Sequence, residues 1–76
     1  MITLNELPVG ASARIVGFEG ASPSYRRKLL SLGLTPGVIV VVARVAPLGD
    51  PMEVRVRGFA LSLRKTEAAA LIVEKA

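Results

Sequence analysis

The stretch Met52-Glu53-Val54-Arg55-Val56-Arg57 alternates apolar and charged side chains without interruption. Successive side chains of a β-strand point to opposite faces, so this stretch predicts a strand with one buried face and one face in water. Gly58 then permits a turn, and residues 59–64 continue with Leu61 and Leu63 alternating against polar neighbours. This part of the chain therefore predicts two consecutive short strands.

Further predicted strands flank this pair on both sides. Residues 38–46 are rich in Val and Ile and predict a core strand, which Pro47-Leu48-Gly49-Asp50-Pro51 ends. Residues 13–18 predict an earlier strand with β-branched side chains. Residues 71–73 predict a last strand, which follows a turn capped by Thr66. The sequence thus predicts five short strands.

One helix is predicted between the first strand and the core strand. Ser22 can accept an N-cap hydrogen bond, and Gly33 suits a left-handed C-cap. At 100° per residue, Tyr25, Leu29 and Leu32 share one helical face, which we expect to pack on the strands. Arg26, Arg27 and Leu30 point elsewhere, so either the domain buries this helix on two sides or these three residues form a patch for a partner.

The predicted elements favour a mainly β fold, a small SH3-like barrel of about five short strands with one α-helix after the first long strand. Closure into a barrel protects strand edges that a chain of 76 residues cannot cover with helices. An OB-fold is the alternative, although its helix usually lies between the third and fourth strands. We expect residues 1–76 to form a single domain, with at most one helical turn at residues 3–6.

The composition excludes several classes of protein. Of the residues, 51% are hydrophobic, the net charge is +4, and the chain contains neither Cys nor His. Disulfides, thiolate nucleophiles and His-based catalysis are thereby excluded. The longest apolar run, residues 38–43, is too short to cross a membrane. The first residues lack the features of a signal peptide, so we expect a cytoplasmic protein.

The sequence contains no strong motif for a catalytic, nucleotide-binding or metal site. The glycines match no nucleotide-binding loop, and the scattered carboxylates suggest no acid pair. Four arginines could line one face and bind RNA phosphates, which leaves a small RNA-binding barrel as an alternative: Arg44, Arg55, Arg57 and Arg64. The candidate metal ligands have no fixed spacing, and no cofactor is expected: Met1, Met52, Asp50 and Glu53.

Two segments are specific enough to resemble a known family. The helix ends with the sequence LLSLGLTPG at residues 29–37, and a loop at residues 46–51 has the sequence APLGDP. Together with LPVG at residues 7–10 and VRGFALSLR at residues 56–64, these segments resemble the FeoA family over nearly the whole chain.

The resemblance implies a small cytoplasmic SH3-like protein that assists bacterial ferrous iron uptake without catalysis. It implies the membrane permease FeoB as partner, through its cytoplasmic region, so that contact with the membrane is indirect; weak self-association stays open. A free-standing regulatory domain, like the C-terminal domain of DtxR-type repressors, is the alternative. We expect the partner to contact the helix and the 46–51 loop beside it, through these residues: Tyr25, Arg26, Arg27, Leu30, Leu48 and Asp50.

Overall fold

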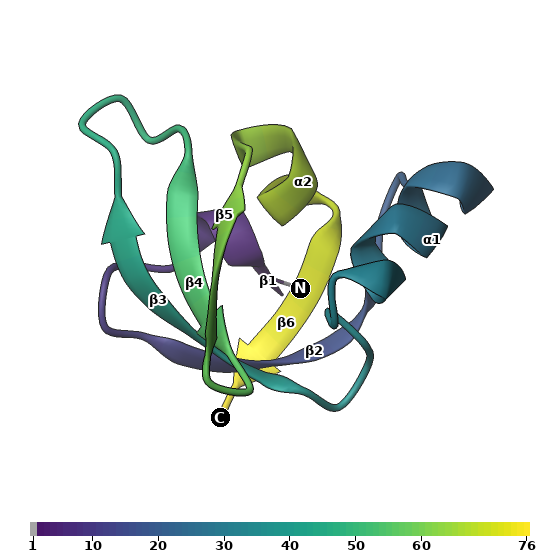
Figure 1. The fold of residues 1–76 in the computed structure, drawn as a ribbon, viewed down its shortest axis with the longest axis horizontal. Helices are drawn as coiled ribbons and strands as arrows, with labels where there is room; N and C mark the ends of the chain where they lie inside the picture. Colours follow the sequence, from purple (N-terminus) through teal and green to yellow (C-terminus); the bar gives the residue numbers. More distant parts are fainter. Residues whose placement is uncertain (1) are drawn as a thin grey trace.

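The computed structural model describes residues 2–76 and places six strands in one antiparallel sheet (Figure 1). The strands are β1 (Ile2–Thr3), β2 (Ser12–Phe18), β3 (Ile39–Val45), β4 (Met52–Val56), β5 (Phe59–Leu63) and β6 (Leu71–Lys75). The helical elements are a 3-10 turn, η1 (Leu4–Glu6), and two α-helices, α1 (Pro23–Ser31) and α2 (Lys65–Ala69).

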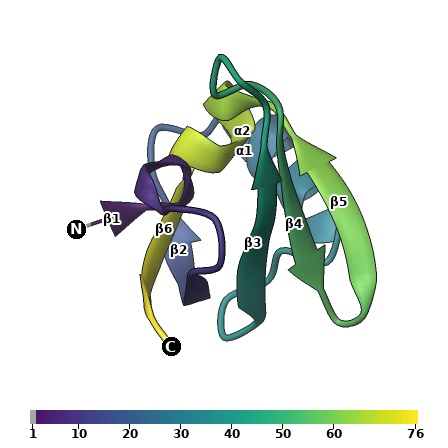
Figure 2. The ribbon, with the colours of Figure 1, turned by 90° about the vertical axis from the view of Figure 1, so that its left-hand side faces the viewer.

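The sheet curls around a single core cluster. Its strand order is β1-β6-β2-β3-β4-β5, so β1 and β5 are its two edges. The register shifts between Ile15 and Gly17 in β2 and between Val42 and Arg44 in β3, and such bulges increase the bend and twist of a strand. Figure 2 shows β6 and β2 on one side and β3, β4 and β5 on the other, with α2 at the top.

The mainly β prediction is confirmed, while the count of five strands and one helix is wrong in detail. The sixth strand, β1, has only two residues and pairs with β6, so it carries no alternation that a sequence pattern could reveal. The segment predicted to be a turn after Thr66 is the short helix α2, which begins one residue earlier, at Lys65. The expected helical turn at residues 3–6 is the 3-10 turn η1.

The strand pattern places the core as predicted. Met52, Val54 and Val56 are buried along β4, whereas Arg55 lies on the exposed face. Fully buried large side chains also come from η1, from α1 and the segment after it, and from β2, β3, β5 and β6. They are Leu4, Ile15, Leu29, Leu34, Val40, Val42, Leu63 and Leu71. Helix α1 therefore contributes Leu29 to the same core as the strands.

Local sequence signals set the ends of α1 and the turn between β4 and β5. The Ser22 hydroxyl oxygen accepts a hydrogen bond from the Tyr25 backbone N–H at 3.2 Å, and Gly33 follows the helix with a φ of 93°. Arg57 and Gly58 have φ values of 51° and 84°, which is the geometry of a two-residue type I′ hairpin. The predicted caps and the predicted turn are thus confirmed.

The 3-10 turn contains a carboxylate whose charge supports the fold. Glu6 Oε2 accepts a hydrogen bond from the Thr3 backbone N–H at 2.7 Å, and this bond, with one from the Thr3 hydroxyl, lowers the pKa of Glu6. A carboxyl with a lowered pKa in the folded state adds stability above its ordinary pKa and loses it as the pH falls through the lowered value.

We therefore expect Glu6→Gln to be less stable than the wild type at neutral pH. The difference should shrink as the pH falls below the ordinary value of 4.5, because the wild-type carboxylate becomes protonated there. Urea denaturation of both proteins between neutral and acidic pH measures this convergence. A constant difference across that range would contradict the assigned hydrogen bonds.

Candidate functional site

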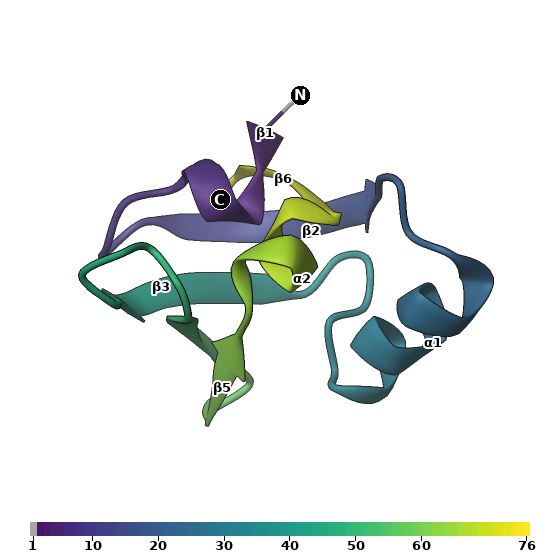
Figure 3. The same cartoon turned by 90° about the horizontal axis from the view of Figure 1, so that it is seen from above.

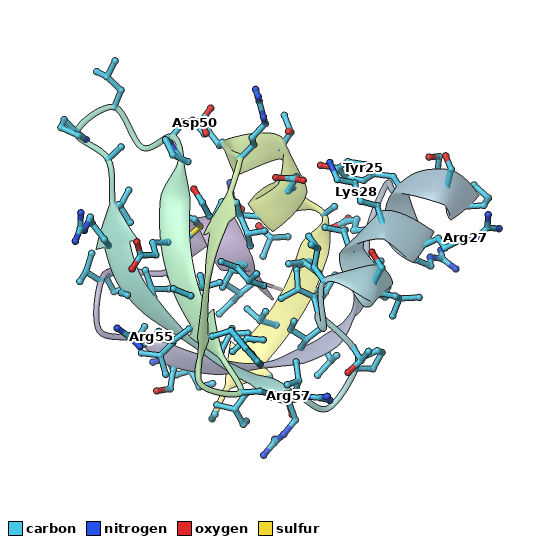
Figure 4. All side chains as sticks on the ribbon, viewed as in Figure 1. Tyr25, Arg27, Lys28, Asp50, Arg55 and Arg57 are labelled. Carbon is cyan, nitrogen blue, oxygen red and sulfur yellow. The ribbon has the colours of Figure 1, made fainter. Side chains whose placement is uncertain are left out.

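Helix α1 divides its side chains between the core and the solvent. Leu29 is fully buried and Tyr25 is partly buried against the core cluster. Leu30, the next residue, is 36% exposed, and Arg27 extends outward from the helix (Figure 4). The outer side of α1 therefore presents an apolar side chain and a guanidinium together, which favours the second of the two alternatives that the sequence left open.

Two residues of this region have environments that helical periodicity did not predict. The Arg26 guanidinium lies 5.7 Å from the centroid of the Phe18 ring, a cation–π contact that joins α1 to β2. Leu32, expected in the core, is 37% exposed. The helix ends at Ser31, so Leu32 lies in the C-cap and leaves the face that Tyr25 and Leu29 share.

The loop between β3 and β4 separates its two candidate residues. Leu48 is 91% exposed and lies in a turn closed by a hydrogen bond from the Gly49 N–H to the Ala46 carbonyl. Asp50 Oδ1 instead accepts a hydrogen bond from the Lys65 backbone N–H at 3.0 Å. Asp50 therefore satisfies a backbone donor in the first turn of α2, a structural role that the sequence did not indicate.

The expected single surface of α1 and the 46–51 loop does not form. Figures 1 and 3 show this loop at one side of the molecule and α1 at the other, with α2 and β5 between them. The expectation that Leu48 lies beside α1 is wrong, because the path of the strands separates the loop between β3 and β4 from the helix between β2 and β3. Only the Asp50 end of the loop approaches α1, across a groove.

That groove is the hollow where α1, the end of the 46–51 loop, β5 and α2 meet. Its volume is about 560 Å³. Two lining residues, Lys28 and Leu32, come from α1, and the others come from the opposite elements: Asp50, Pro51, Ser62, Arg64 and Glu67. Figure 4 shows Tyr25 and Lys28 on the side of α1 that is directed toward α2.

Glu67 is the centre of the charged contacts in the groove. Its carboxylate accepts a hydrogen bond from the Arg64 backbone N–H at 2.8 Å and pairs with Lys28 Nζ at 3.3 Å. Glu67 is buried, whereas the Lys28 side chain is 61% exposed. Sequence reasoning missed this residue because it assigned the cap to Thr66. The structure has Arg64 as the N-cap, and Glu67 lies three residues after it, which is the spacing of a capping box.

The four arginines considered for RNA binding do not share one face. Figure 4 shows Arg55 and Arg57 at the lower end of the sheet. Arg64 follows the opposite end of β5 and lines the groove. Arg57 Nη2 donates a hydrogen bond to the Thr35 hydroxyl at 3.4 Å, which holds it near the β4–β5 turn. Arg64 is therefore separated from Arg55 and Arg57, so the four arginines do not form one face.

The structure also exposes an aromatic side chain that the sequence assigned no role. Phe59 is 70% exposed at the start of β5, beside its partner Val56, which is buried. Cross-strand partners point to the same face of a sheet, so Phe59 lies on the core side of β5 but beyond the part that the core covers. An exposed aromatic next to an open strand edge is a feature of docking surfaces.

Two of the four candidate metal ligands are methionines. Met1 lies outside the described residues, and Met52 is buried in the core with 3% exposure, as expected for a core side chain. Within residues 2–76, no group of three or more Asp or Glu side chains lies close enough together to hold a metal ion. Over the same range, no helix has the length and apolar character needed to span a bilayer.

The curled six-stranded sheet with its short helices defines a small SH3-like domain. The chain belongs to the FeoA family, since the FeoA domain matches residues 2–75. The resemblance stated from the helix exit and the 46–51 loop is thereby confirmed, and the SH3-like assignment holds against the OB-fold.

Several relatives carry the same domain. A fusion protein of Porphyromonas gingivalis, described as Fe(2+) transport protein A joined to the Fe(2+) transporter FeoB, is 38% identical over 71 residues; these cover 93% of this chain and 8% of the fusion protein. The solution structure of FeoA from Chlorobium tepidum is 40% identical, with a TM-score of 0.87 over 97% of this chain and 70% of that one. The FeoA of Stenotrophomonas maltophilia, solved with zinc and described as a prokaryotic SH3 domain protein, is 31% identical, with a TM-score of 0.83 over 97% of this chain and 91% of that one.

Proposed function

We propose that this protein is a cytoplasmic, non-catalytic accessory factor of bacterial ferrous iron uptake that acts by binding the permease FeoB. The observation that carries the proposal is the Porphyromonas gingivalis relative, in which an FeoA segment similar to 93% of this chain is covalently joined to FeoB. A fusion keeps two partners at high effective concentration, so separate chains of the same kinds are expected to associate. The association would act on the GTPase domain or on the assembly of the permease.

The outer side of α1 is the surface that best fits such a contact. Leu30 is 36% exposed beside Arg27. Arginine is enriched among the residues that dominate binding energy, and burial of an exposed apolar side chain next to it is favourable. Tyr25 and Arg26 hold this helix on the domain through the core cluster and through Phe18, so the face is presented on a fixed element. The loop that carries Leu48 lies at the other side of the molecule from α1 in Figure 1, so Leu48 serves as a control.

We expect Leu30→Asp to weaken binding to the purified cytoplasmic region of FeoB by at least about tenfold, because a carboxylate would be desolvated without a partner in the contact. Isothermal titration calorimetry measures the affinity. The matched variant Leu48→Asp should bind like the wild type, since it adds the same charge on the other side of the domain. Unchanged binding by a folded Leu30→Asp variant would remove α1 from the contact.

The role in uptake is tested in cells. A strain that lacks this gene should grow poorly on limiting Fe(II), and the wild-type chain should restore growth while Leu30→Asp should not. Restoration by Leu30→Asp, or normal growth of the deletion strain, would contradict the proposed function.

A further inference from the structure

Strand β5 is an edge of the sheet, and its outer side is unpaired. The sheet order ends at β5, which pairs only with β4 among the described strands. Edge strands present backbone N–H and C=O groups at the spacing of an extended chain, and many proteins bind peptides by adding a strand there.

The turn at Arg57 and Gly58 fixes which backbone groups of β5 are free. Val56 and Phe59 flank this two-residue turn, and the closing pair of such a hairpin exchanges both backbone hydrogen bonds. Pairing alternates along antiparallel strands, so the N–H and C=O groups of Ala60 and Ser62 point away from β4. Within residues 2–76, no turn, loop or cap hydrogen bond reaches these backbone groups.

The groove described above reaches this free edge at Ser62. Ser62 and Arg64, which follows β5, line one side of the groove, and Lys28 of α1 and the C-cap residue Leu32 line the other. A chain paired with Ser62 would therefore lie between β5 and α1. The exposed side chains of Phe59 and Leu32, 70% and 37% accessible, offer apolar contacts beside that path.

The charges of the β4–β5 hairpin favour an acidic occupant. Residues 52–65 contain four basic side chains, Arg55, Arg57, Arg64 and Lys65, and one acidic side chain, Glu53. The Arg64 side chain is exposed, and it forms no salt bridge within residues 2–76. The net charge beside the edge is therefore positive.

We propose that the β5 edge binds an extended acidic segment of the FeoB cytoplasmic region as an additional strand of the sheet. This inference rests on the proposed function, since it names the form of the FeoB segment and a second surface that it uses. Ala60 and Ser62 supply the backbone hydrogen bonds, and Arg64 pairs with a carboxylate of the segment. The outer side of α1 and the free edge of β5 belong to adjacent elements, so one FeoB molecule can contact both.

Ser62→Pro tests the strand pairing. Proline removes the Ser62 N–H and places its ring at the edge, and it is tolerated where that N–H faces solvent. We expect the affinity for the FeoB cytoplasmic region to fall by at least about tenfold. Ser62→Ala keeps the N–H and should bind like the wild type. Circular dichroism verifies folding of both variants.

The outcomes separate this inference from the proposed function. Wild-type binding that Ser62→Pro leaves unchanged overturns the strand pairing while the proposed function stands. Absence of binding by the wild type overturns both. A third outcome also overturns the inference. If sedimentation shows that Ser62→Pro loses self-association while its affinity for FeoB is unchanged, the edge pairs with a second copy of this chain.

Two further measurements test the inference even if the proline variant fails to fold. In the wild type, hydrogen exchange at the Ala60 and Ser62 amides should slow on addition of the FeoB region, and unchanged exchange would overturn the inference. Arg64→Gln should weaken binding several-fold at low ionic strength and by much less at about 0.5 M salt, where exposed charges are screened. An equal loss at both salt concentrations would contradict an acidic segment.

Discussion

Replacing Leu29 with Ala is expected to lower the free energy of unfolding by about 2–5 kcal/mol. Leu29 is fully buried and is the residue of α1 that enters the shared core cluster. Truncation removes apolar contacts and leaves a cavity between the helix and the strands. A domain of 76 residues has a total stability of only about 4–11 kcal/mol, so the variant would be marginally folded.

Urea denaturation and thermal melting measure this effect, with a fall in Tm of at least about 10 °C expected. Leu48→Ala is the matched control, because Leu48 is 91% exposed and its truncation should change stability by no more than about 0.5 kcal/mol. Equal stabilities of the two variants would mean that α1 is not packed on the core as described.

Replacing Glu67 with Ala is expected to lower the free energy of unfolding by about 1–3 kcal/mol. The change leaves the Arg64 backbone N–H without its acceptor at 2.8 Å and Lys28 without its counter-charge. Because Glu67 is buried, water replaces these contacts only in part. Urea denaturation measures the loss.

Two companion variants divide the contributions of Glu67. Lys28→Met removes only the ion pair, and the Lys28 side chain is 61% exposed, so its cost should be under about 1 kcal/mol. Glu67→Gln keeps an oxygen acceptor for the Arg64 N–H and should fall between Lys28→Met and Glu67→Ala. If Glu67→Ala costs no more than Lys28→Met, the hydrogen bond to Arg64 adds nothing to stability.

The groove links the fold to the proposed contacts. Glu67 and Lys28 join α2 to α1 across it, and Asp50 joins the 46–51 loop to α2. These contacts hold α1 beside the free edge of β5, so that two adjacent elements can present one binding region. A change at Glu67 is therefore expected to weaken partner binding indirectly as well as stability.

Local features were predictable because neighbouring residues determine them. The alternation of Met52, Val54 and Val56 gave the buried face of β4, since side chains of a strand point to alternate faces. Ser22 and Gly33 gave the ends of α1, since a hydroxyl acceptor and a left-handed residue satisfy the terminal backbone groups. The family resemblance likewise came from contiguous segments.

The sequence by itself thus determined the predicted strands, the main helix and the family, whereas the structure decided that Leu30 is exposed. Only the tertiary structure decided that Leu48 and α1 lie apart, that Asp50 and Glu67 satisfy backbone donors of α2, and that Ala60 and Ser62 line a free edge. The reason is that strand order and the bends at the β-bulges set the distances between segments remote in sequence, and no local pattern of side chains encodes these distances.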